Sequence, residues 1–315
     1  MYRAHMEVGK LDAIHSINLA GSPLGVSDAI PGGKVFNVQN TNGHDTGAGE
    51  TDKPWKTLDY ALGKCEADRG DLIRLLPGHA ETISTAGGLT LDKDGVTVRG
   101  YGRYDLRPTF TFTSAGTFLA TAANAAFEGC KVMAGVADIA VGLLITGVGF
   151  RLAYNTFADL GALNWVDVIH VSAADNDADG LEIIGNEILT QDDATVTAID
   201  LLKDIADAKI IGNRIIGDFN ATPFAPIYQA STEFATNVLV THNLIHNLHN
   251  ADAAVAISMA GTSSTGWMMH NHSYALDLAN STPFLTGATG IYCAENYQAY
   301  AATDSGFLSP PAGTI

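Results

Sequence analysis

The sequence predicts an all-β fold, a right-handed parallel β-helix, because a short phrase of strand-forming residues recurs along most of the chain. The segment "IIGNEIL" that begins at Ile183 returns as "IIGNRII" from Ile210. Aligned copies share one residue type at Asn155, Asn186, Asn213, Asn243, Asn271 and Asn296, and Gly100 and Cys130 fall in register before them. These positions recur on average about every 28 residues, which is within the range of a solenoid repeat.

Each repeat has one short apolar run before the Asn and another after it, a pattern typical of strands. Ile, Val, Leu and Phe dominate these runs, and neither run reaches the ten or so residues that a helix needs. A propeller blade needs about 40–45 residues and tight hairpins, whose Asn-Gly or Asp-Gly signals hardly occur between the runs. The pattern therefore favours a parallel β-helix, in which equivalent residues of successive coils stack about 4.8 Å apart.

The repeated Asn predicts a structural ladder at one corner of the coil. An Asn there can adopt left-handed backbone angles and pass amide hydrogen bonds to the Asn above and below. Gly100 and Cys130 mark coils in which the ladder has not yet begun, and Gly212 eases the bend before Asn213. Loops that leave other corners, such as "HVSAADNDADG" from residue 170 to 180, absorb the variable repeat length.

The open end of a solenoid needs a cap, and residues 54–66 predict one. Trp55, Leu58, Leu62 and Cys65 are spaced i, i+3, i+7 and i+10 after Pro54, which indicates an amphipathic helix of about three turns. Before it, "KVFNVQ" predicts a strand. The Gly-rich "TGAGET" lacks the Lys-Ser/Thr ending of a phosphate-binding loop, so it is interpreted as a turn that leads to the helix.

The order of "KVFNVQ", "GAGETDKPWKTLDYAL", "GDLIRLLPGHAETI", "GLTLDKDGVTVRGYG" and "RPTFTF" resembles the opening of right-handed parallel β-helix proteins of the pectate-lyase-like superfamily. It is most similar to β-helix virion proteins of tailed bacteriophages. The resemblance covers about residues 34–300, and residues 55–110 are its most specific part. It implies a homotrimer on the particle surface, either a tailspike or a tailspike-like spike that decorates the capsid.

Three regions are expected along the chain. Residues 1–33 carry no repeat and are interpreted either as an N-terminal arm that attaches to the major capsid protein or another virion protein, or as a disordered or loosely packed leader. Residues 34–300 form the β-helix with its capping helix. Residues 301–315, with two prolines and two glycines in "DSGFLSPPAGTI", predict an extended C-terminal tail.

Composition restricts the partners. The formal net charge is −17, from 34 acidic and 17 basic residues, so no nucleic-acid partner is expected. The charge-free runs at 139–150 and 253–269 are too short or too polar to span a membrane. The N-terminal residues lack the pattern of a secretory signal, which predicts synthesis in the host cytoplasm. The resemblance implies a location in the virion, at the capsid surface or the tail. Only 16% of residues are charged, so part of the surface is expected to be hidden between subunits.

Acidic clusters are the first candidates for catalysis, because polysaccharide-cleaving tailspikes use pairs of carboxylates. They are Asp175, Asp177 and Asp179, then Asp192 and Asp193, then Asp200, Asp204 and Asp207. Pairs could lie about 5–9 Å apart across neighbouring coils. With 34 acidic residues on a stacked surface, such pairs also arise by chance, and solvated loop acids are the simpler interpretation.

Candidate metal ligands are equally weak. The "DNDAD" run of residues 175–179 is similar to a calcium loop but lacks its Gly and Glu. Secreted pectate lyases pair acidic calcium ligands with an Arg base, and no such cluster is evident among Arg99, Arg103, Arg107, Arg151 and Arg214. Histidines concentrate at His242, His246, His249, His270 and His272; His242 and His270 would stack one coil apart. Cys65, Cys130 and Cys293 have no spacing typical of a metal knuckle or disulfide framework.

The sequence therefore favours a structural virion protein, a trimeric β-helix spike that decorates the capsid and aids adsorption to the host surface. We assign no catalytic, cofactor-binding or metal-binding residue and expect no cofactor. The alternatives are a tailspike depolymerase, either a polysaccharide hydrolase or a lyase, and a non-catalytic adhesin that binds a host surface glycan. Whether the chain is an enzyme stays open, because all three share the fold.

Overall fold

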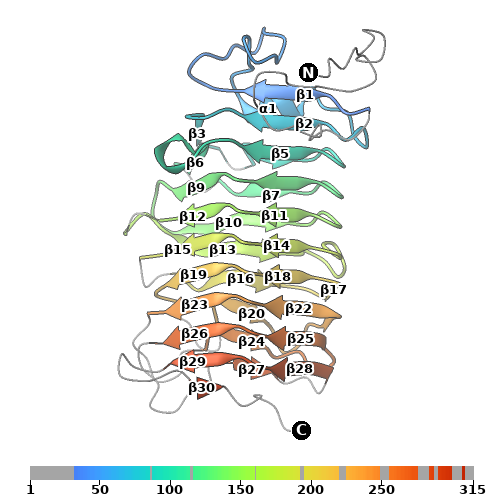
Figure 1. The fold of residues 1–315 in the computed structure, drawn as a ribbon, viewed down its shortest axis with the longest axis vertical. Coiled ribbons are helices and arrows are strands. Elements are labelled where there is room, and N and C mark those ends of the chain that lie inside the picture. Colours follow the sequence, from blue (N-terminus) through green and yellow to red (C-terminus); the bar gives the residue numbers. More distant parts are fainter. Residues whose placement is uncertain are drawn as a thin grey trace, which may run out of the picture.

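The computed structural model describes residues 32–85, 87–113, 116–159, 161–191, 195–219, 225–248, 255–275, 284–286, 290–299 and 307–308. Within these ranges the chain is a right-handed parallel β-helix, as the repeat predicts, and its coils stack along one long axis from β1 to β28 and β29 (Figure 1). The predicted arm lies outside the described residues except for residues 32 and 33, and so does most of the predicted tail. No helix in the described ranges is long and apolar enough to cross a membrane.

Three sheets run along the solenoid, and each coil between its two ends contributes one strand to each sheet in turn. The first sheet contains β1 (Val35–Val38), β2 (Leu72–Leu75), β5 (Thr97–Gly100), β8 (Ala126–Glu128), β11 (Arg151–Ala153), β14 (Glu182–Ile184), β18 (Lys209–Ile211), β22 (Val238–Thr241), β25 (Thr265–Met269) and β28 (Gly290–Ala294). The second sheet contains β3 (Ala80–Ile83), β6 (Thr109–Phe112), β9 (Lys131–Ala134), β12 (Thr156–Ala158), β15 (Glu187–Leu189), β19 (Arg214–Gly217), β23 (Leu244–Asn247), β26 (His272–Ala275), β29 (Tyr297–Ala299) and β30 (Phe307–Leu308).

The third sheet has no counterpart in the sequence prediction, because its strands follow the loops of most variable length. It contains β4 (Leu89–Leu91), β7 (Phe118–Ala120), β10 (Ile139–Ile145), β13 (Trp165–Val171), β16 (Thr197–Leu201), β20 (Ile227–Gln229), β24 (Ile257–Met259) and β27 (Phe284–Thr286). Two further short strands pair with each other: β17 (Ile205–Ala206), which follows β16 in the chain, and β21 (Ala235–Thr236), which follows β20. Among the described residues, all pairings between named strands are parallel except β29 with β30.

The predicted Asn ladder is confirmed at the corner between the first and second sheets. The six Asn residues from Asn155 to Asn296 are buried. At each step the side-chain oxygen of one Asn accepts the backbone N–H of the Asn one coil earlier, as in Asn155 N to Asn186 Oδ1 at 2.9 Å. Cys130 N donates to Asn155 Oδ1 at 2.9 Å, so Cys130 occupies the rung before the ladder, as predicted.

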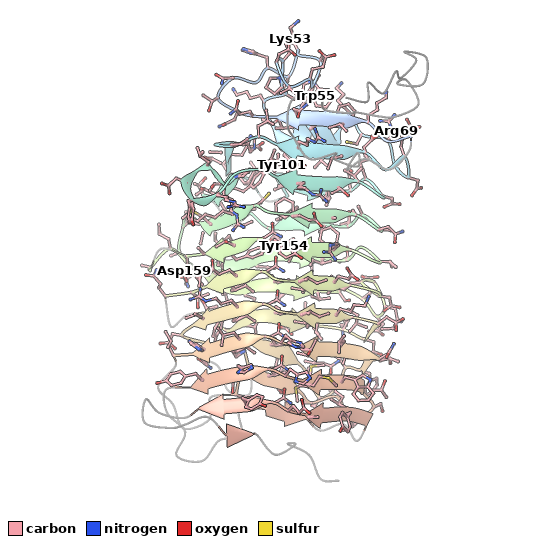
Figure 2. The ribbon with its side chains drawn as sticks, viewed as in Figure 1. Lys53, Trp55, Arg69, Tyr101, Tyr154 and Asp159 are labelled. Carbon is pink, nitrogen blue, oxygen red and sulfur yellow. The ribbon has the colours of Figure 1, made fainter. Side chains whose placement is uncertain are left out.

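The prediction that the Asn itself takes left-handed angles is wrong. The positive φ belongs to the residue just before it, including Tyr154 at 58°, Gly212 at 66° and His270 at 54°. The Asn side chain turns inward to bond its neighbours, so the preceding residue makes the reversal and faces outward. Gly212 therefore eases the bend, as expected, and Tyr154 stands at the same corner of an earlier coil (Figure 2).

The capping helix is shorter than the predicted span of 54–66. Helix α1 covers Leu58–Leu62, with Thr57 Oγ1 accepting the backbone N–H of Tyr60, and it packs against β1, β2 and β4 near the N-terminal end of the solenoid (Figure 1). Trp55 is extended instead, because its backbone pairs with that of Asn37 and Gln39. Its ring stacks on Phe36 at 4.7 Å, so a short helix and one indole share the capping role.

The interior between the sheets is filled by apolar side chains. Phe127 is fully buried and contacts the rings of Phe118 and Phe110 at centroid distances of 4.9 and 5.9 Å. Trp165 is also fully buried, against Phe112 at 5.7 Å. These side chains come from all three sheets, so the apolar core holds the coils together from within.

Candidate functional site

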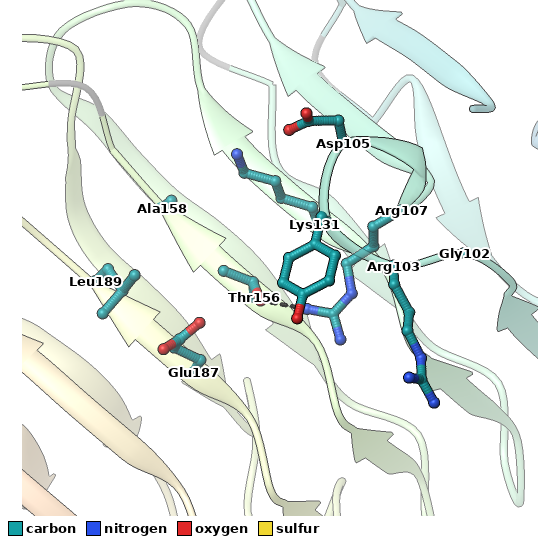
Figure 3. A pocket seen from close by; sticks show the side chains of 10 residues that line it. Gly102, Arg103, Asp105, Arg107, Lys131, Thr156, Ala158, Glu187 and Leu189 are labelled. Carbon is teal, nitrogen blue, oxygen red and sulfur yellow. Dashed lines mark hydrogen bonds between the residues drawn. The ribbon is translucent and has the colours of Figure 1, made fainter. Parts of the chain in front are cut away.

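A groove of about 560 Å³ opens on the outer face of the second sheet. One wall is the 101–107 loop, which includes the 3₁₀ helix η2 (Tyr104–Leu106), and the floor comes from β9, β12 and β15 (Figure 3). Its lining residues are Gly102, Arg103, Tyr104, Asp105, Arg107, Lys131, Thr156, Ala158, Glu187 and Leu189. The groove thus combines an aromatic ring, three cationic groups, two carboxylates and small side chains.

The loop is held in place by Arg107. Its guanidinium donates to Thr156 Oγ1, shown dashed in Figure 3, and to the backbone oxygen of Tyr154 at 3.0 Å. Gly102 is required at the other end of the turn, where φ is 129° and an added Cβ would lie 2.2 Å from the Leu106 carbonyl oxygen. The two hydrogen bonds of Arg107 fix the loop against the coil that contains Tyr154 and Thr156.

This loop exposes the side chain of Tyr104 to solvent. It is 93% exposed, the most exposed large hydrophobic residue of the described chain, and its φ is 52°. A left-handed backbone costs energy for a residue with a Cβ, and such strain tends to occur at functional positions. The strained and exposed position of Tyr104 is therefore a candidate for ligand contact.

The groove is net cationic on a strongly acidic chain, because its three basic side chains outnumber the acidic Asp105 and Glu187. Glu187 is paired with Arg214 across adjacent strands β15 and β19. No hydrogen bond or ion pair within the described residues engages the side chain of Arg103 or Lys131. Two cationic groups are therefore available beside Tyr104 to a ligand that carries negative charge.

A second polar cluster lies on the third sheet. Asp167 and His170 belong to β13, and Asp200 belongs to β16, directly opposite His170 in the strand register. His170 Nε2 is 3.1 Å from Asp167 Oδ2 and 3.9 Å from Asp200 Oδ2. Thr197 Oγ1 donates to Asp167 Oδ1 at 2.6 Å, which orients that carboxylate.

The cluster is largely withdrawn from water, and Asp200 is only 6% exposed. Burial raises the pKa of Asp200 to about 6; the charge of His170 opposes this shift and the charge of Asp167 adds to it. Tyr228 follows Asp200 in register on β20, and its pKa is raised by burial and by the charge of Asp200. Asp200 is thus a carboxyl group poised near neutral pH, a property that concentrates at functional sites.

The three acidic side chains of the "DNDAD" run contact different partners, so they are not arranged as the ligands of a calcium loop. Asp177 Oδ2 accepts the backbone N–H of Ala174 at 2.9 Å, and Asp179 Oδ1 accepts that of Ala206 at 2.7 Å. Asp175 instead lies with Asp204 and Glu233, whose carboxylate oxygens are all within 4.8 Å of one another.

The remaining candidate acids also separate. Asp200 belongs to the cluster on the third sheet, whereas Asp207 accepts a hydrogen bond from Asn237 Nδ2 at 2.6 Å. Asp192 and Asp193 lie outside the described residues.

The predicted stacking of His242 on His270 is confirmed. Their rings are 5.0 Å apart, and His270 Nδ1 lies 3.2 Å from Glu295 Oε2 one coil further on. His246 instead contacts Tyr274, and His272 stacks on Tyr297. His249 lies outside the described residues.

The cysteines form no disulfide. Cys65 and Cys130 are buried, Cys293 is partly buried, and all three are free thiols. Burial raises the pKa of Cys65 to about 12 and that of Cys293 to about 11, so neither is an activated thiolate. The "TGAGET" turn packs under Trp55, whose Nε1 donates to the Gly47 carbonyl oxygen at 2.9 Å, in keeping with its interpretation as a turn.

Sequence reasoning missed Asp167 and His170, and it did not group Arg103 and Arg107 with Lys131. The loop expected from His170 onward begins only after Val171, because His170 itself lies in β13. The signal for Asp167 and His170 is an Asp-x-x-His spacing, with Asp200 following His170 after about one repeat length.

No family model matches the sequence, and no curated protein matches it significantly. Several solved structures are similar in fold at low identity. A rhamnogalacturonan lyase is 14% identical with a TM-score of 0.40, covering 77% of this chain and 74% of that chain. The pectate lyase Pel9A is 16% identical with a TM-score of 0.45, covering 90% and 82%. The GH136 lacto-N-biosidase from Eubacterium ramulus is 10% identical with a TM-score of 0.48, covering 90% and 67%.

Proposed function

We propose that this chain is a spike protein of a tailed-bacteriophage virion that binds an acidic glycan on the host surface. The observation that carries the proposal is the groove on the second sheet, where the exposed Tyr104 stands beside the cationic Arg103 and Lys131. The virion part of the proposal is supported by the sequence resemblance across residues 55–110. The glycan part is supported by the chemistry of the groove.

Each component of the groove matches a component of an acidic sugar. The ring of Tyr104 offers an apolar face with a polar hydroxyl, which suits a sugar ring whose faces are apolar and whose edges carry hydroxyls. The guanidinium of Arg103 can form two parallel hydrogen bonds to a carboxylate, and Lys131 adds a compact positive charge. Because Arg107 anchors the 101–107 loop, the backbone of that loop loses little conformational entropy when a ligand binds.

A panel of uronate and sialate oligosaccharides, each with its methyl-esterified counterpart, tests the glycan part. We expect the acidic forms to bind, with affinity that falls as salt increases. Tyr104→Ala should weaken binding about tenfold, or about 1.4 kcal/mol, while Tyr297→Ala, an exposed tyrosine of β29 at the far end of the same sheet, should leave it unchanged. Equal binding of charged and esterified forms, or unchanged binding by Tyr104→Ala, would contradict the proposal.

The same incubations separate adhesion from the alternative of depolymerisation. A lyase or hydrolase would release unsaturated products or new reducing ends from the bound polysaccharide. A pure adhesin would return the polysaccharide intact.

The trimeric state is part of the proposal and is supported by an apolar row on the first sheet. Leu239, Trp267 and Tyr292 follow Lys209 in strand register, and Trp267 and Tyr292 are 47% and 56% exposed. Earlier coils of this sheet instead carry an ion-paired row, as in Arg151 with Glu128 and Glu182. Copies of the chain packed along this row would bury the two aromatic side chains.

Light scattering on the full chain should give about three times its 33.0 kDa mass. Trp267→Glu should shift the mass toward that of one chain, because a buried charge without a partner opposes association. Thr51→Glu, on an exposed turn near the N-terminal end, changes the net charge by the same amount and serves as the control. A monomeric wild-type protein at high concentration would refute the trimer.

A further inference from the structure

The geometry of Asp167, His170 and Asp200 points to a metal site: we propose that these residues hold one divalent transition-metal ion, with Zn²⁺ as the best match. The site lies on the third sheet and is independent of the glycan groove on the second sheet. One donor atom from each residue lies within 4.8 Å of the other two.

The strand register creates this convergence. Asp167 and His170 are three positions apart on β13, and Asp200 is the direct neighbour of His170 on β16. Three donors come from two adjacent, regularly hydrogen-bonded strands, so the backbone fixes their relative positions. Sites built on regular elements hold their geometry better than sites on loops.

The nitrogen of His170 gives independent support. His170 Nε2 is buried, and although Asp167 Oδ2 is 3.1 Å away, their alignment does not make a hydrogen bond. Buried polar atoms normally have a partner, and an unsatisfied one needs an explanation. A nitrogen placed between two carboxylate oxygens, without a proper hydrogen bond to either, fits a metal ligand.

The donor set selects the class of ion. One imidazole with two carboxylates suits Zn²⁺ and similar first-row ions, whereas Ca²⁺ and Mg²⁺ prefer oxygen donors alone. Donors at about 2.0–2.1 Å from a tetrahedral ion lie about 3.3 Å apart. The separations of 3.1 and 3.9 Å from His170 Nε2 are close to this value, and the Asp167 and Asp200 oxygens lie within 4.8 Å of each other.

The groups around the three donors also favour a bound cation. The hydrogen bond from Thr197 to Asp167 Oδ1 leaves Oδ2, the oxygen nearer His170, available to the ion. Two carboxylates balance the charge of a divalent cation in this buried setting. Three protein ligands leave a coordination position for water or a ligand.

The other group of carboxylates, Asp175 with Asp204 and Glu233, is not proposed as a metal site. Asp204 Oδ1 already accepts the backbone N–H of Phe234 at 2.6 Å, and Glu233 Oε1 is 3.2 Å from Lys203 Nζ. Asp175 is exposed, and the group contains no nitrogen donor. It therefore supplies a control residue for the test.

The test titrates the EDTA-treated, dialysed full chain with Zn²⁺ and, separately, with Ca²⁺, using calorimetry and metal analysis of the dialysed protein. We expect one Zn²⁺ per chain at micromolar affinity or tighter, with no comparable Ca²⁺ binding. His170→Ala and Asp200→Asn should each weaken Zn²⁺ binding more than about 100-fold, and Thr197→Val about tenfold. Asp175→Asn and His270→Ala should bind as the wild type does.

Visible absorption of the Co²⁺-loaded chain gives a second readout, which His170→Ala should abolish. If His170→Ala fails to fold by circular dichroism, Asp200→Asn, which keeps the side-chain volume, decides the question. The proposal is overturned if the wild type shows no saturable Zn²⁺ site, if these variants retain it, or if His270→Ala removes it.

Discussion

Replacement of Asn213 by Leu should lower the free energy of unfolding by roughly 3–4 kcal/mol, one of the two largest effects expected in this chain. Asn213 Oδ1 accepts the backbone N–H of Asn186 at 2.9 Å, and its Nδ2 donates to the Ile183 carbonyl oxygen at 2.9 Å and to Asn243 Oδ1 at 3.0 Å. Leu has similar volume but makes none of these bonds. Buried polar groups of the two neighbouring coils would then lose partners that water cannot replace.

The matched control is Asn42→Leu, because Asn42 is exposed and its side chain bonds only weakly, to Gln39 at 3.4 Å. That change should alter stability by less than about 0.5 kcal/mol. Urea unfolding followed by circular dichroism measures both variants. Equal stability of the two would mean that the ladder does not stabilise the solenoid.

The second large effect is a pH-dependent gain of stability in Asp200→Asn. The folded pKa of Asp200 is about 6, above the ordinary value of 3.8, because burial disfavours its charge. Between about pH 4 and 6 the folded state therefore binds more protons at this group than the unfolded state, so stability falls as pH rises through that window. The wild type should lose about 2–3 kcal/mol from this group by pH 7, and the Asn variant should not.

The difference between Asp200→Asn and wild type should accordingly be small at pH 4 and large at pH 7. Urea unfolding with EDTA present measures it, at low protein concentration because the isoelectric point is near 4.7. The facing groups His170, Asp167 and Tyr228 are present in both proteins, so the difference reports the charge of Asp200 together with its interactions with them. A difference that does not change with pH would contradict the raised pKa.

The Asn ladder shows why the coil could be predicted from the sequence. A buried Asn that bonds its equivalents above and below must recur once per coil, so it appears as a period even though the repeat length varies from coil to coil. The strands on each side of Asn186 and Asn213 could be predicted for the same reason, because they keep a fixed distance from the Asn. The third sheet follows loops of variable length and has no comparable marker.

The cap shows the limit of helical periodicity. The spacing of Trp55, Leu58 and Leu62 predicts one helix, yet Trp55 takes an extended conformation. Its backbone partners Asn37 and Gln39 lie well before it in the chain, and that pairing overrides the local pattern. The spacing of these residues correctly predicted that their side chains are buried. The backbone conformation of Trp55 is set instead by its hydrogen bonds to a distant part of the chain.

The two candidate sites required the register between coils. Arg103 and Lys131 come from successive coils, as do Asp167 and Asp200, so neither pair stands out in the sequence as a motif. The glycan groove also depends on the left-handed turn at Tyr104, for which the sequence offers only a nearby glycine. By contrast, the acids that stand close together in "DNDAD" bond to separate partners. Acidic residues that are close in the sequence therefore do not form a shared site on the solenoid.

The central claim, an acidic-glycan site on the second sheet, is tested most directly by a crystal structure of the full chain with the tightest-binding acidic oligosaccharide. We predict a sugar ring against Tyr104, with its carboxylate bound to Arg103 or Lys131. An oligosaccharide bound only elsewhere, for example along Trp267 and Tyr292, would contradict the claim.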